Sequence, residues 1–490
     1  MTSIETKLKQ CEKTLYEYLK EHAKLRGSKP YLITEDATLS YAQAFKTVNA
    51  LIGQLKGNGI KKGTVVALRA TRSPQTVMLT IALGAIGAII ALTDPHNLVK
   101  TFISDCGVEI FPEYYITNEK TSCDLGAREG WQLLNGENSV DISFQESEIQ
   151  LLEQPESRAN DPFMIIFTSG STGKAKAVVL SHKNCIANPV DAMPLFKQDE
   201  NDRAISLLPL DHVFGFALAA CATFCGHDVM FPEKLDTEYV LCCLDKYRIS
   251  VIYAVPSFFL GLLSDGAHKK HDLSTLRLGL MAGAPFTAEQ LRYIEGELGL
   301  QLMPGYGMSE CVGVSTMNYG ASVEERSTGV GKLYPMTEIK FTDGGEICVR
   351  GATLMLGYYN DEKATNEAID EQGFLHTGDL GYIDVNGYLH INGRIKDIII
   401  RNGNNLSAVE IERKIISLEK VKDACVVGIP DKDDGEVPCA LIVASECVDD
   451  ELLKVLTKIE KPKHVIYSRR VPLTSSGKPD KQAVKNLFLK

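Results

Sequence analysis

Short apolar runs alternate with amphipathic stretches along the N-terminal part of the chain. Runs of this kind occupy residues 65–68, 164–167, 204–208, 251–254 and 276–281. Apolar strands that alternate with helical segments are typical of an α/β protein with layered sheets. Because the chain has 490 residues and a domain usually has about 100–200, we also expect more than one domain.

Longer patterns predict a helix, a buried helix–strand unit and a surface segment. Residues 40–55 form an amphipathic pattern that begins at a capping serine, Ser40. The apolar run at 76–92 contains glycines and is followed by Thr-Asp-Pro. This predicts a buried helix that continues into a buried strand, with membrane contact as the alternative. Residues 117–161 are polar and irregular, so we expect a surface connection rather than core.

The pattern changes near residue 395. Upstream, Gly378-Asp379 and Asn386-Gly387 punctuate short strands and predict a hairpin. We predict a large N-terminal domain of layered α/β sheets with a β-rich subdomain, residues 1–395, and a small mobile α+β domain, residues 396–490. The segment at 393–397 would be the hinge. In the small domain we expect strands at 398–400, 424–429 and 439–444 and a helix at 408–418.

Charge and cysteine content narrow the possible functions. The formal net charge is −11, which argues against a nucleic-acid binder because phosphate neutralisation needs a basic surface. The 13 cysteines are an odd number without a Cys-x-x-Cys pair, and residues 1–10 contain no apolar signal core. We therefore expect a reduced, cytoplasmic protein without stable insertion in a membrane.

The strongest chemical signal is the segment at 163–178, FMIIFTSGSTGKAKAV. An apolar strand ends here in a loop of Ser, Thr and Gly that is closed by two lysines. Glycines let backbone N–H groups converge on phosphate oxygens, while hydroxyls and lysines add donors and charge. The spacing differs from that of the P-loop. A flexible linker is the alternative, but a buried strand that leads directly into the loop favours phosphate binding.

This loop resembles the phosphate loop of the adenylate-forming superfamily, which includes acyl-CoA synthetases, aryl-CoA ligases, non-ribosomal peptide adenylation domains and firefly luciferase. Ala175 and Ala177 replace the usual Pro and Gly of that motif. The resemblance implies binding of the ATP phosphates by Thr168, Ser169, Gly170, Ser171, Thr172, Gly173 and Lys176.

Further segments resemble the other motifs of this superfamily, in the same order along the chain. Gly283, Ala284 and Pro285 look like the segment that lines one side of adenine. The sequence Tyr-Gly-Met-Ser-Glu at 306–310 resembles Tyr-Gly-x-Thr-Glu. By this resemblance Tyr306 stacks on adenine, Ser309 contacts the α-phosphate and Glu310 binds Mg²⁺, and Gly307 belongs to the same nucleotide-binding segment.

The resemblance continues through the end of the predicted large domain and into the small domain. Asp379 and Arg394 are similar to the residues that bind ribose, and a carboxylate suits a diol because it accepts two hydrogen bonds. Lys396 takes the place of the hinge residue, and Gly403 that of the glycine that lets pantetheine pass. Lys478, in a Pro-x-Thr-x-x-Gly-Lys pattern, corresponds to the lysine that catalyses adenylation. Lys481 replaces an arginine of the superfamily.

The nature of the acid follows less directly. His212 matches the histidine of the superfamily's Pro-x-aromatic-His segment, where members that activate amino acids usually have Asp. We therefore expect an acid other than an α-amino acid, with His212 as a possible gate or a structural histidine. An apolar pocket wall formed by Phe214, Val255, Pro256, Met281 and Val312 would fit an aliphatic or aryl acid.

These motifs together imply an ATP- and Mg²⁺-dependent ligase that forms an acyl-AMP and passes the acyl group to a thiol. CoA is the first candidate for the thiol, and the phosphopantetheine of a carrier protein is the second. A non-catalytic nucleotide-binding relative and a luciferase-type oxygenase are the alternatives from other classes. A non-catalytic relative would show no pyrophosphate exchange with any acid, and light emission with luciferin would reveal the oxygenase.

Overall fold

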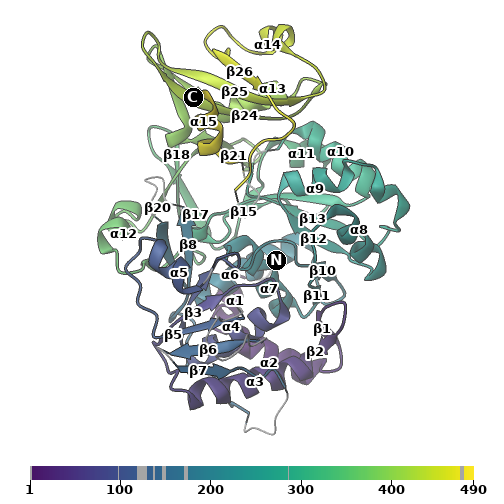
Figure 1. Cartoon of the computed structure of the whole chain (residues 1–490), viewed down its shortest axis with the longest axis vertical. Helices are drawn as coiled ribbons and strands as arrows, with labels where there is room; N and C mark the ends of the chain where they lie inside the picture. The colour runs from purple at the N-terminus through teal and green to yellow at the C-terminus, as the bar shows by residue number, and fades with distance from the viewer. Residues whose placement is uncertain are drawn as a thin grey trace.

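The computed structural model describes residues 3–97, 99–118, 130–135, 138–145, 151–169, 175–284, 286–474 and 479–489. A large N-terminal part carries a small C-terminal part on top of it (Figure 1). This arrangement agrees with the fold class expected from the alternating apolar runs.

Parallel strands form the middle of the first sheet. Its strands are β1 (Pro30–Ile33), β2 (Thr38–Ser40), β10 (Arg203–Ile205), β11 (Asp228–Met230), β12 (Val251–Ala254), β13 (Leu278–Met281), β14 (Gln301–Tyr306), β15 (Ser315–Thr316) and β16 (Lys332–Leu333). The order is β16-β15-β14-β13-β12-β10-β11-β1-β2, and the strands from β14 to β1 are parallel. Because parallel strands share one carboxyl edge, the loops after β10, β12, β13 and β14 gather along that edge.

The second sheet lies beside the first and has a parallel centre as well. Its strands are β3 (Val65–Arg69), β4 (Ile89–Thr93), β5 (Tyr114–Thr117), β6 (Gln132–Asn135), β7 (Asn138–Asp141), β8 (Pro162–Ser169), β9 (Ala175–Ser181) and β19 (Gly357–Tyr358). The order is β19-β9-β8-β4-β3-β5-β6-β7. Alternate residues face opposite sides: Val66 and Leu68 enter the core shared with the first sheet, and Val65 and Ala67 enter a separate core.

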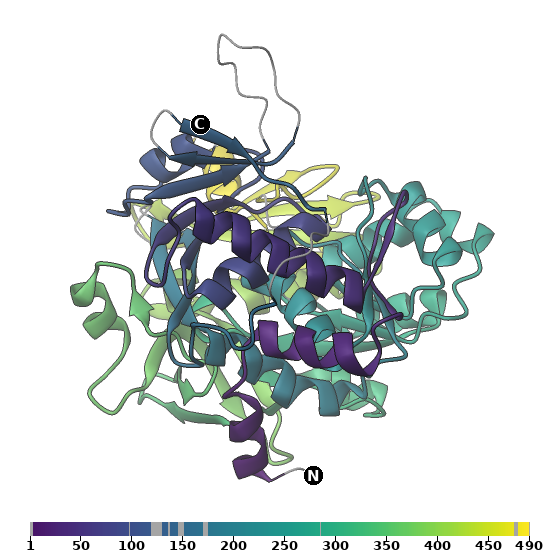
Figure 2. The ribbon, with the colours of Figure 1, turned by 90° about the horizontal axis from the view of Figure 1, so that it is seen from below.

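Helices cover both sheets. They are α1 (Ile4–Gln10), α2 (Leu15–Leu25), α3 (Tyr41–Gly57), α4 (Pro74–Ile86), α5 (Val99–Asp105), α6 (His182–Phe196), α7 (Val213–Cys225), α8 (Thr237–Lys246), α9 (Pro256–Leu263), α10 (Ala288–Leu298) and α11 (Val323–Thr328). Helix α2 packs beside α3, and Figure 2 shows these purple helices across the underside of the large part.

The sequence signals for α3 and α4 are borne out. The Ser40 side chain accepts a hydrogen bond from the Gln43 backbone N–H and Gln43 reciprocates, which caps α3. Helix α4 has Pro74 in its first turn, ends at Gly87 in a left-handed conformation and is followed by the buried strand β4. Within the part of the chain that the structure describes, no helix combines the length and apolar character needed to span a membrane.

The expectation of a surface connection at 117–161 is wrong for part of that segment. Strands β6 and β7 extend the second sheet: β6 pairs antiparallel with β5, and β7 pairs antiparallel with β6. Trp131 and Leu133 are 8% and 4% exposed and belong to the shared core. The strands are too short, and their polar positions too frequent, for periodicity alone to reveal them.

A third sheet forms the β-rich subdomain. It contains β17 (Thr337–Phe341), β18 (Glu346–Gly351), β20 (Leu375–Ile383) and β21 (Leu389–Arg394), in that order, and α12 (Glu362–Ala368) lies next to it in the chain. The hairpin predicted at Asn386-Gly387 joins β20 and β21. Gly378 and Asp379, expected at a turn, lie instead inside β20, where the pairing with β18 is irregular and Gly378 has φ of +69°. Glycine allows such a bulge within a strand.

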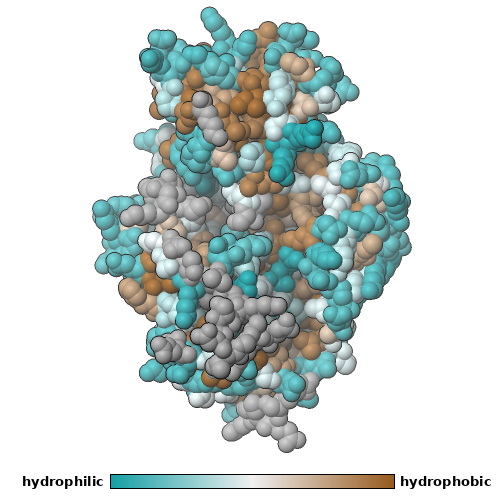
Figure 3. All heavy atoms as spheres, in the orientation of Figure 1, coloured by the Kyte–Doolittle hydropathy of each residue, from teal (hydrophilic) through white to brown (hydrophobic). Residues whose placement is uncertain are grey.

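The small part has its own sheet and its own cores. It contains β22 (Ile398–Arg401), β23 (Asn404–Ser407), β24 (Val421–Asp431), β25 (Gly435–Ala444) and β26 (His464–Tyr467), with α13 (Ala408–Ile416), α14 (Asp449–Val455) and α15 (Lys481–Phe488). Apolar clusters lie on both faces of this sheet. A short 3₁₀ turn, Ile395–Asp397, connects it to β21. In Figure 3 apolar surface shows on the small part at the top and in the hollow below it.

Candidate active site

One cavity of about 1550 Å³ lies where the two parts of the chain meet. The loops after β10, β12, β13 and β14 form one side of it, the β8–β9 hairpin another, and the third sheet and the small part close it. The predicted site residues that line this cavity are Thr168, Lys176, His212, Gly283, Ala284, Tyr306, Gly307, Ser309, Glu310, Asp379, Arg394 and Lys396.

The predicted phosphate loop connects two antiparallel strands. Thr168, near the end of β8, pairs in register with Lys176, near the start of β9. Ser169 is the last residue of β8. Gly170, Ser171, Thr172 and Gly173 lie outside the described residues, as does Pro285 of the predicted adenine segment. The hairpin register therefore places both ends of the loop at the cavity.

Tyr358 links Lys176 to Glu310. The Lys176 Nζ lies 4.5 Å from the centre of the Tyr358 ring, and the Tyr358 hydroxyl donates a hydrogen bond of 3.0 Å to Glu310 Oε1. Glu310 is 8% exposed and lines the cavity. Burial, and then the nearby Glu310 carboxylate, raise the pKa of Tyr358, so this hydroxyl stays a donor. Tyr358 was missed from the sequence because a tyrosine after glycine carries no signal of its own.

Asp379 is held by two donors at the cavity wall. Strands β20 and β21 pair Asp379 directly with Arg394, whose Nε lies 2.5 Å from Asp379 Oδ1. The Tyr306 hydroxyl donates to Asp379 Oδ2 at 2.6 Å. Asp379 is only 4% exposed. Burial, followed by the neighbouring Asp379 charge, raises the pKa of Tyr306 well above its ordinary value. The three residues predicted for adenine and ribose thus form one hydrogen-bonded unit.

The turn after Tyr306 leaves no room for a side chain at Gly307. A Cβ atom there would lie 2.4 Å from the Val312 carbonyl oxygen. Val312 itself has φ of +24°, an unusual value for a β-branched residue. This tight turn positions Ser309 and Glu310 in a short 3₁₀ turn, Ser309–Cys311, at the cavity.

His212 lies at the N-terminus of α7 and lines the cavity, without capping the helix through its side chain. Next to it, Asp211 also lines the cavity, and burial raises the pKa of its carboxyl. Asp211 stands where the resembling proteins often carry an aromatic residue, and its burial could not be read from the sequence.

The apolar wall of the cavity is only partly the predicted one. Phe214, Val255 and Val312 line it. Met281 and Pro256 do not: Met281 is 1% exposed in the core on the far side of the first sheet, and Pro256 is buried in the first turn of α9. Strand alternation turns Met281 away from the cavity. The wall instead includes Met193, Phe196, Ala217, Cys221, Tyr253 and Tyr334.

The small part contributes to the cavity the residues that flank one of its two predicted functional segments. Lys478 lies outside the described residues, but Thr474 and Pro479 on either side of it line the cavity. Leu473 bridges to Pro479, which closes the base of this loop. Gly403, at the β22–β23 turn with φ of +76°, is not among the described residues that line the cavity.

An ionic cluster surrounds the predicted hinge. Lys396 is exposed and lines the cavity from the 3₁₀ turn. The Lys481 Nζ lies 2.9 Å from Asp397 Oδ2 and 4.0 Å from Glu412 Oε1. Burial raises the pKa of the Glu412 carboxyl to about 7, although the Lys481 charge opposes this shift. Asp397 and Glu412 were not singled out from the sequence.

Comparison with known proteins identifies the family. Residues 19–359 match the model of the AMP-binding enzyme family, and residues 410–478 match that of the AMP-binding enzyme C-terminal domain. The chain therefore belongs to the AMP-binding enzyme family, and the resemblance inferred from its motifs is confirmed.

Relatives of known sequence and structure agree with this assignment. The chain is 27% identical over 475 residues to a probable CoA ligase, CCL5, of Humulus lupulus, which covers 90% of this chain and 86% of the relative. It is 34% identical over 336 residues to the putative acyl-CoA synthetase YngI of Bacillus subtilis, covering 64% of this chain and 61% of that one. The o-succinylbenzoate CoA synthetase MenE of Bacillus subtilis, in complex with the acyl-adenylate intermediate OSB-AMP, superposes with a TM-score of 0.80 at 25% identity over 98% of each chain. The predicted fold class is confirmed.

Proposed function

We propose that this protein is an AMP-forming acid–thiol ligase, which activates a carboxylic acid with ATP and transfers the acyl group to CoA. The observation that carries this proposal is that motifs from separate stretches of the chain line one cavity. Phosphate-binding, adenine-binding and ribose-binding candidates meet there with Thr474 and Pro479, which flank the segment that contains Lys478. The CoA ligases among the relatives support the same reaction.

In the first step the acid's carboxylate attacks the α-phosphorus of ATP, and pyrophosphate leaves. Thr168 and Lys176, with the loop between them, would hold the departing phosphates. The Tyr306–Asp379–Arg394 unit would fix the nucleoside, because a carboxylate already oriented by two donors needs little reorganisation to accept ribose hydroxyls. Lys478 would lie between two anions, the attacking carboxylate and the α-phosphate, and reduce their repulsion.

Glu310 fits a magnesium ligand. Its carboxylate is held at the cavity wall by Tyr358, and hard oxygen ligands are those that Mg²⁺ prefers. When bound, Mg²⁺ would offset the negative charge of the phosphates. Tyr358 donates a hydrogen bond to Glu310 Oε1 and so orients the carboxylate. Glu310 also lines the cavity, where its carboxylate could bind the metal.

For the second step we propose that the small part, residues 396–490, turns about Lys396. Thr474 and Pro479, which flank Lys478, line the cavity and Gly403 does not, which suits the adenylation step. A rotation would exchange them, so that the thiol of CoA passes Gly403, attacks the acyl carbon of the anhydride and releases AMP. The exposed Lys396 and the short 3₁₀ turn around it suit a hinge.

The composition of the wall suggests an aliphatic or aryl acid without a second charge. The apolar wall comes largely from α6, α7 and β12. None of these elements contributes a lysine or arginine to the described lining, where such residues are Lys176, Arg394, Lys396, Arg413 and Lys481. A second carboxylate on the substrate would therefore be buried without a partner, at a cost of several kcal/mol.

The test is a panel of aliphatic, aryl, dicarboxylic and amino acids incubated with ATP, Mg²⁺ and CoA. Mass spectrometry should find the CoA thioester with one or more uncharged-tail acids, and parallel reactions with a phosphopantetheine carrier protein show which thiol is used. A panel in which pyrophosphate is released but no CoA thioester forms would overturn CoA as the acceptor. Preference for a dicarboxylic or amino acid would overturn the substrate class alone.

A further inference from the structure

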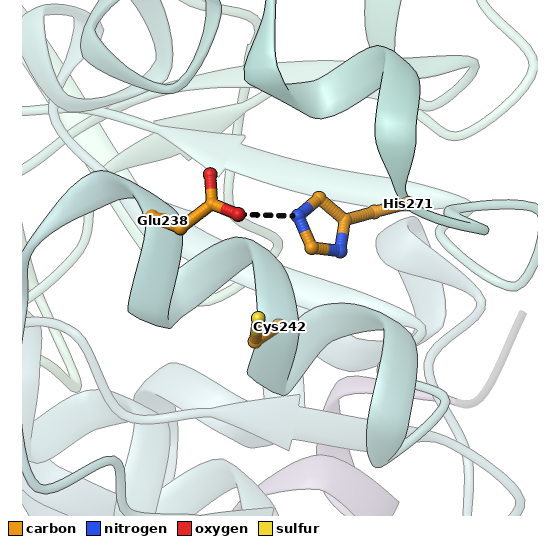
Figure 4. Close-up of side chains that lie close together, drawn as sticks. All are labelled: Glu238, Cys242 and His271. Carbon is orange, nitrogen blue, oxygen red and sulfur yellow. Dashed lines mark ion pairs between the residues drawn. The ribbon is translucent and has the colours of Figure 1, made fainter.

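A carboxylate, a thiol and an imidazole meet on the outer side of the first sheet, away from the cavity. Glu238 and Cys242 lie four residues apart on one face of α8, and His271 follows the short 3₁₀ turn Ala267–Lys270. Their possible ligand atoms all lie within 4.8 Å of one another (Figure 4). None of these three residues lines the cavity.

The histidine is oriented in the manner of a metal ligand. Its Nε2 lies 3.4 Å from Glu238 Oε1 and makes no hydrogen bond within the described part of the chain. Its Nδ1 faces a second carboxylate, Asp245, with Oδ2 at 3.7 Å. Metal-binding histidines usually direct the nitrogen that does not bind the metal at such a carboxylate, which fixes the ring. The His271 side chain is 11% exposed, so its surroundings hold it in place.

The other two groups are accessible from solvent. The Glu238 side chain is 60% exposed, and Cys242 is an exposed free cysteine. An ion can therefore reach these two groups without opening the core, and His271 lies directly behind Glu238.

A second cluster of the same three residue types differs from the α8 triad in its hydrogen bonds and burial. Glu346, Cys348 and His376 in the third sheet also lie within reach of one another. There His376 Nδ1 is 2.9 Å from Glu346 Oε2, Glu346 Oε1 accepts from the Gly378 N–H at 3.0 Å, and Cys348 is buried. Those groups are hydrogen-bonded and their thiol is buried, whereas in the α8 triad His271 Nε2 faces Glu238 at 3.4 Å without a hydrogen bond among the described residues and the thiol is exposed.

From this geometry we propose that Glu238, Cys242 and His271 form a Zn²⁺ site. Thiolate, imidazole and carboxylate are the ligands that Zn²⁺ combines, with water in the fourth position. Zinc bonds of about 2.0–2.3 Å place tetrahedral ligands about 3.5 Å apart, so the exposed side chains on α8 need to close by only about 1 Å. Binding releases the Cys242 thiol proton to solvent and ties α8 to the segment around His271.

The test uses cobalt as a spectroscopic substitute for zinc. Reduced full-length protein without nucleotide is titrated with Co²⁺, and the near-ultraviolet thiolate-to-cobalt absorption is recorded. We expect one equivalent to bind with this absorption and Zn²⁺ to displace it. A metal at Glu310 has oxygen ligands and does not produce the band, so the two sites are distinguished.

Variants assign the ligands. Cys242→Ser should abolish the band, and Glu238→Gln and His271→Ala should weaken Co²⁺ binding about 10- to 100-fold. The matched control is Cys447→Ser, which removes another exposed thiol and should leave the titration unchanged. If wild type shows no thiolate absorption, or if Cys242→Ser retains it, the proposed site is wrong. Melting curves of the metal-free variants show that each is folded.

Discussion

The two sides of the cavity are built differently. On the large-domain side, parallel strand ends and cross-strand pairs fix the site residues, and the Tyr306–Asp379–Arg394 unit is complete in itself. On the small-domain side, functional loops project from a separate sheet with separate cores, and the connection is one short 3₁₀ turn. The large-domain side suits a nucleotide site that stays fixed. The small-domain side suits residues that enter the cavity in turn, one for each half-reaction.

The largest expected effect follows from removing Lys478. Lys478→Ala should lower adenylation about 10²–10³-fold, since one charge that acts mainly in the transition state is lost. Thioester formation from supplied acyl-AMP should change less than about threefold, since that half-reaction does not involve the α-phosphate attack. The two half-reactions are measured separately, with Lys454→Ala on α14 as an exposed-lysine control. Equal losses in both halves would contradict the division between the two sides.

On the large-domain side, Asp379→Asn should raise KM for ATP about 30- to 100-fold, because the substitution leaves Arg394 without its carboxylate and weakens ribose binding. The rates of adenylation and of thioester formation should both fall, because both half-reactions use a bound adenine nucleotide. Initial rates against ATP concentration measure the effect. An unchanged KM in a variant with a normal melting temperature would remove Asp379 from the nucleotide site.

Gly403→Leu should reduce CoA-dependent turnover at least tenfold while leaving acid-dependent pyrophosphate release within about twofold. The positive φ of Gly403 strains any side chain there, so Gly403→Ala is the control that adds strain but little bulk. If the alanine variant is as impaired as the leucine variant, backbone strain rather than steric blockage is responsible. If Gly403→Leu loses adenylation equally, the pantetheine path does not pass this turn.

Glu310→Gln should raise the Mg²⁺ concentration needed for half-maximal adenylation about tenfold, because an amide is a poorer ligand than a carboxylate. The hydrogen bond from Tyr358 can be kept by the amide oxygen, which preserves the local structure. Rates measured across a magnesium titration test this. An identical titration curve for wild type and variant would mean that Glu310 does not bind the metal.

The smallest effect concerns the ionic cluster at the hinge. The Glu412 carboxyl has a pKa of about 7 in the folded protein against an ordinary 4.5, so the folded state binds the extra proton. Binding of this proton therefore stabilises the folded state fully below about pH 4.5, and this stabilisation is lost as the pH rises through about 7. Relative to Glu412→Gln, wild type should lose on the order of 1–3 kcal/mol of unfolding free energy between pH 5 and 8. Denaturant titrations at several pH values measure this difference, and a constant difference would refute the raised pKa.

Much of the fold could be predicted from the sequence because the signals for its helices and strands are local. The capping serine of α3, the proline and glycine that bound α4, and the apolar runs of the parallel strands each carry their information within a few residues. Strands β6 and β7 could not be predicted in this way, because the pairing of β6 with β5 and of β7 with β6 depends on tertiary structure.

Sequence motifs predicted that Tyr306 and Asp379 would lie at one site, and both line the cavity, although Asp379 lies inside β20 rather than at a turn. Tyr358 and Glu412 could not be found, because their importance comes from contacts with Lys176, Glu310 and Lys481 that lie far away in the chain. Met281 was misplaced because strand alternation, rather than hydrophobicity, decides which face a residue occupies.

The most direct measurement is the exchange of labelled pyrophosphate into ATP in the presence of a carboxylic acid and the absence of CoA. Adenylation in the cavity predicts exchange that depends on the acid, needs no thiol and disappears in Lys478→Ala. Binding of ATP without exchange for any acid in a broad panel would show instead that the protein holds a nucleotide without performing the reaction.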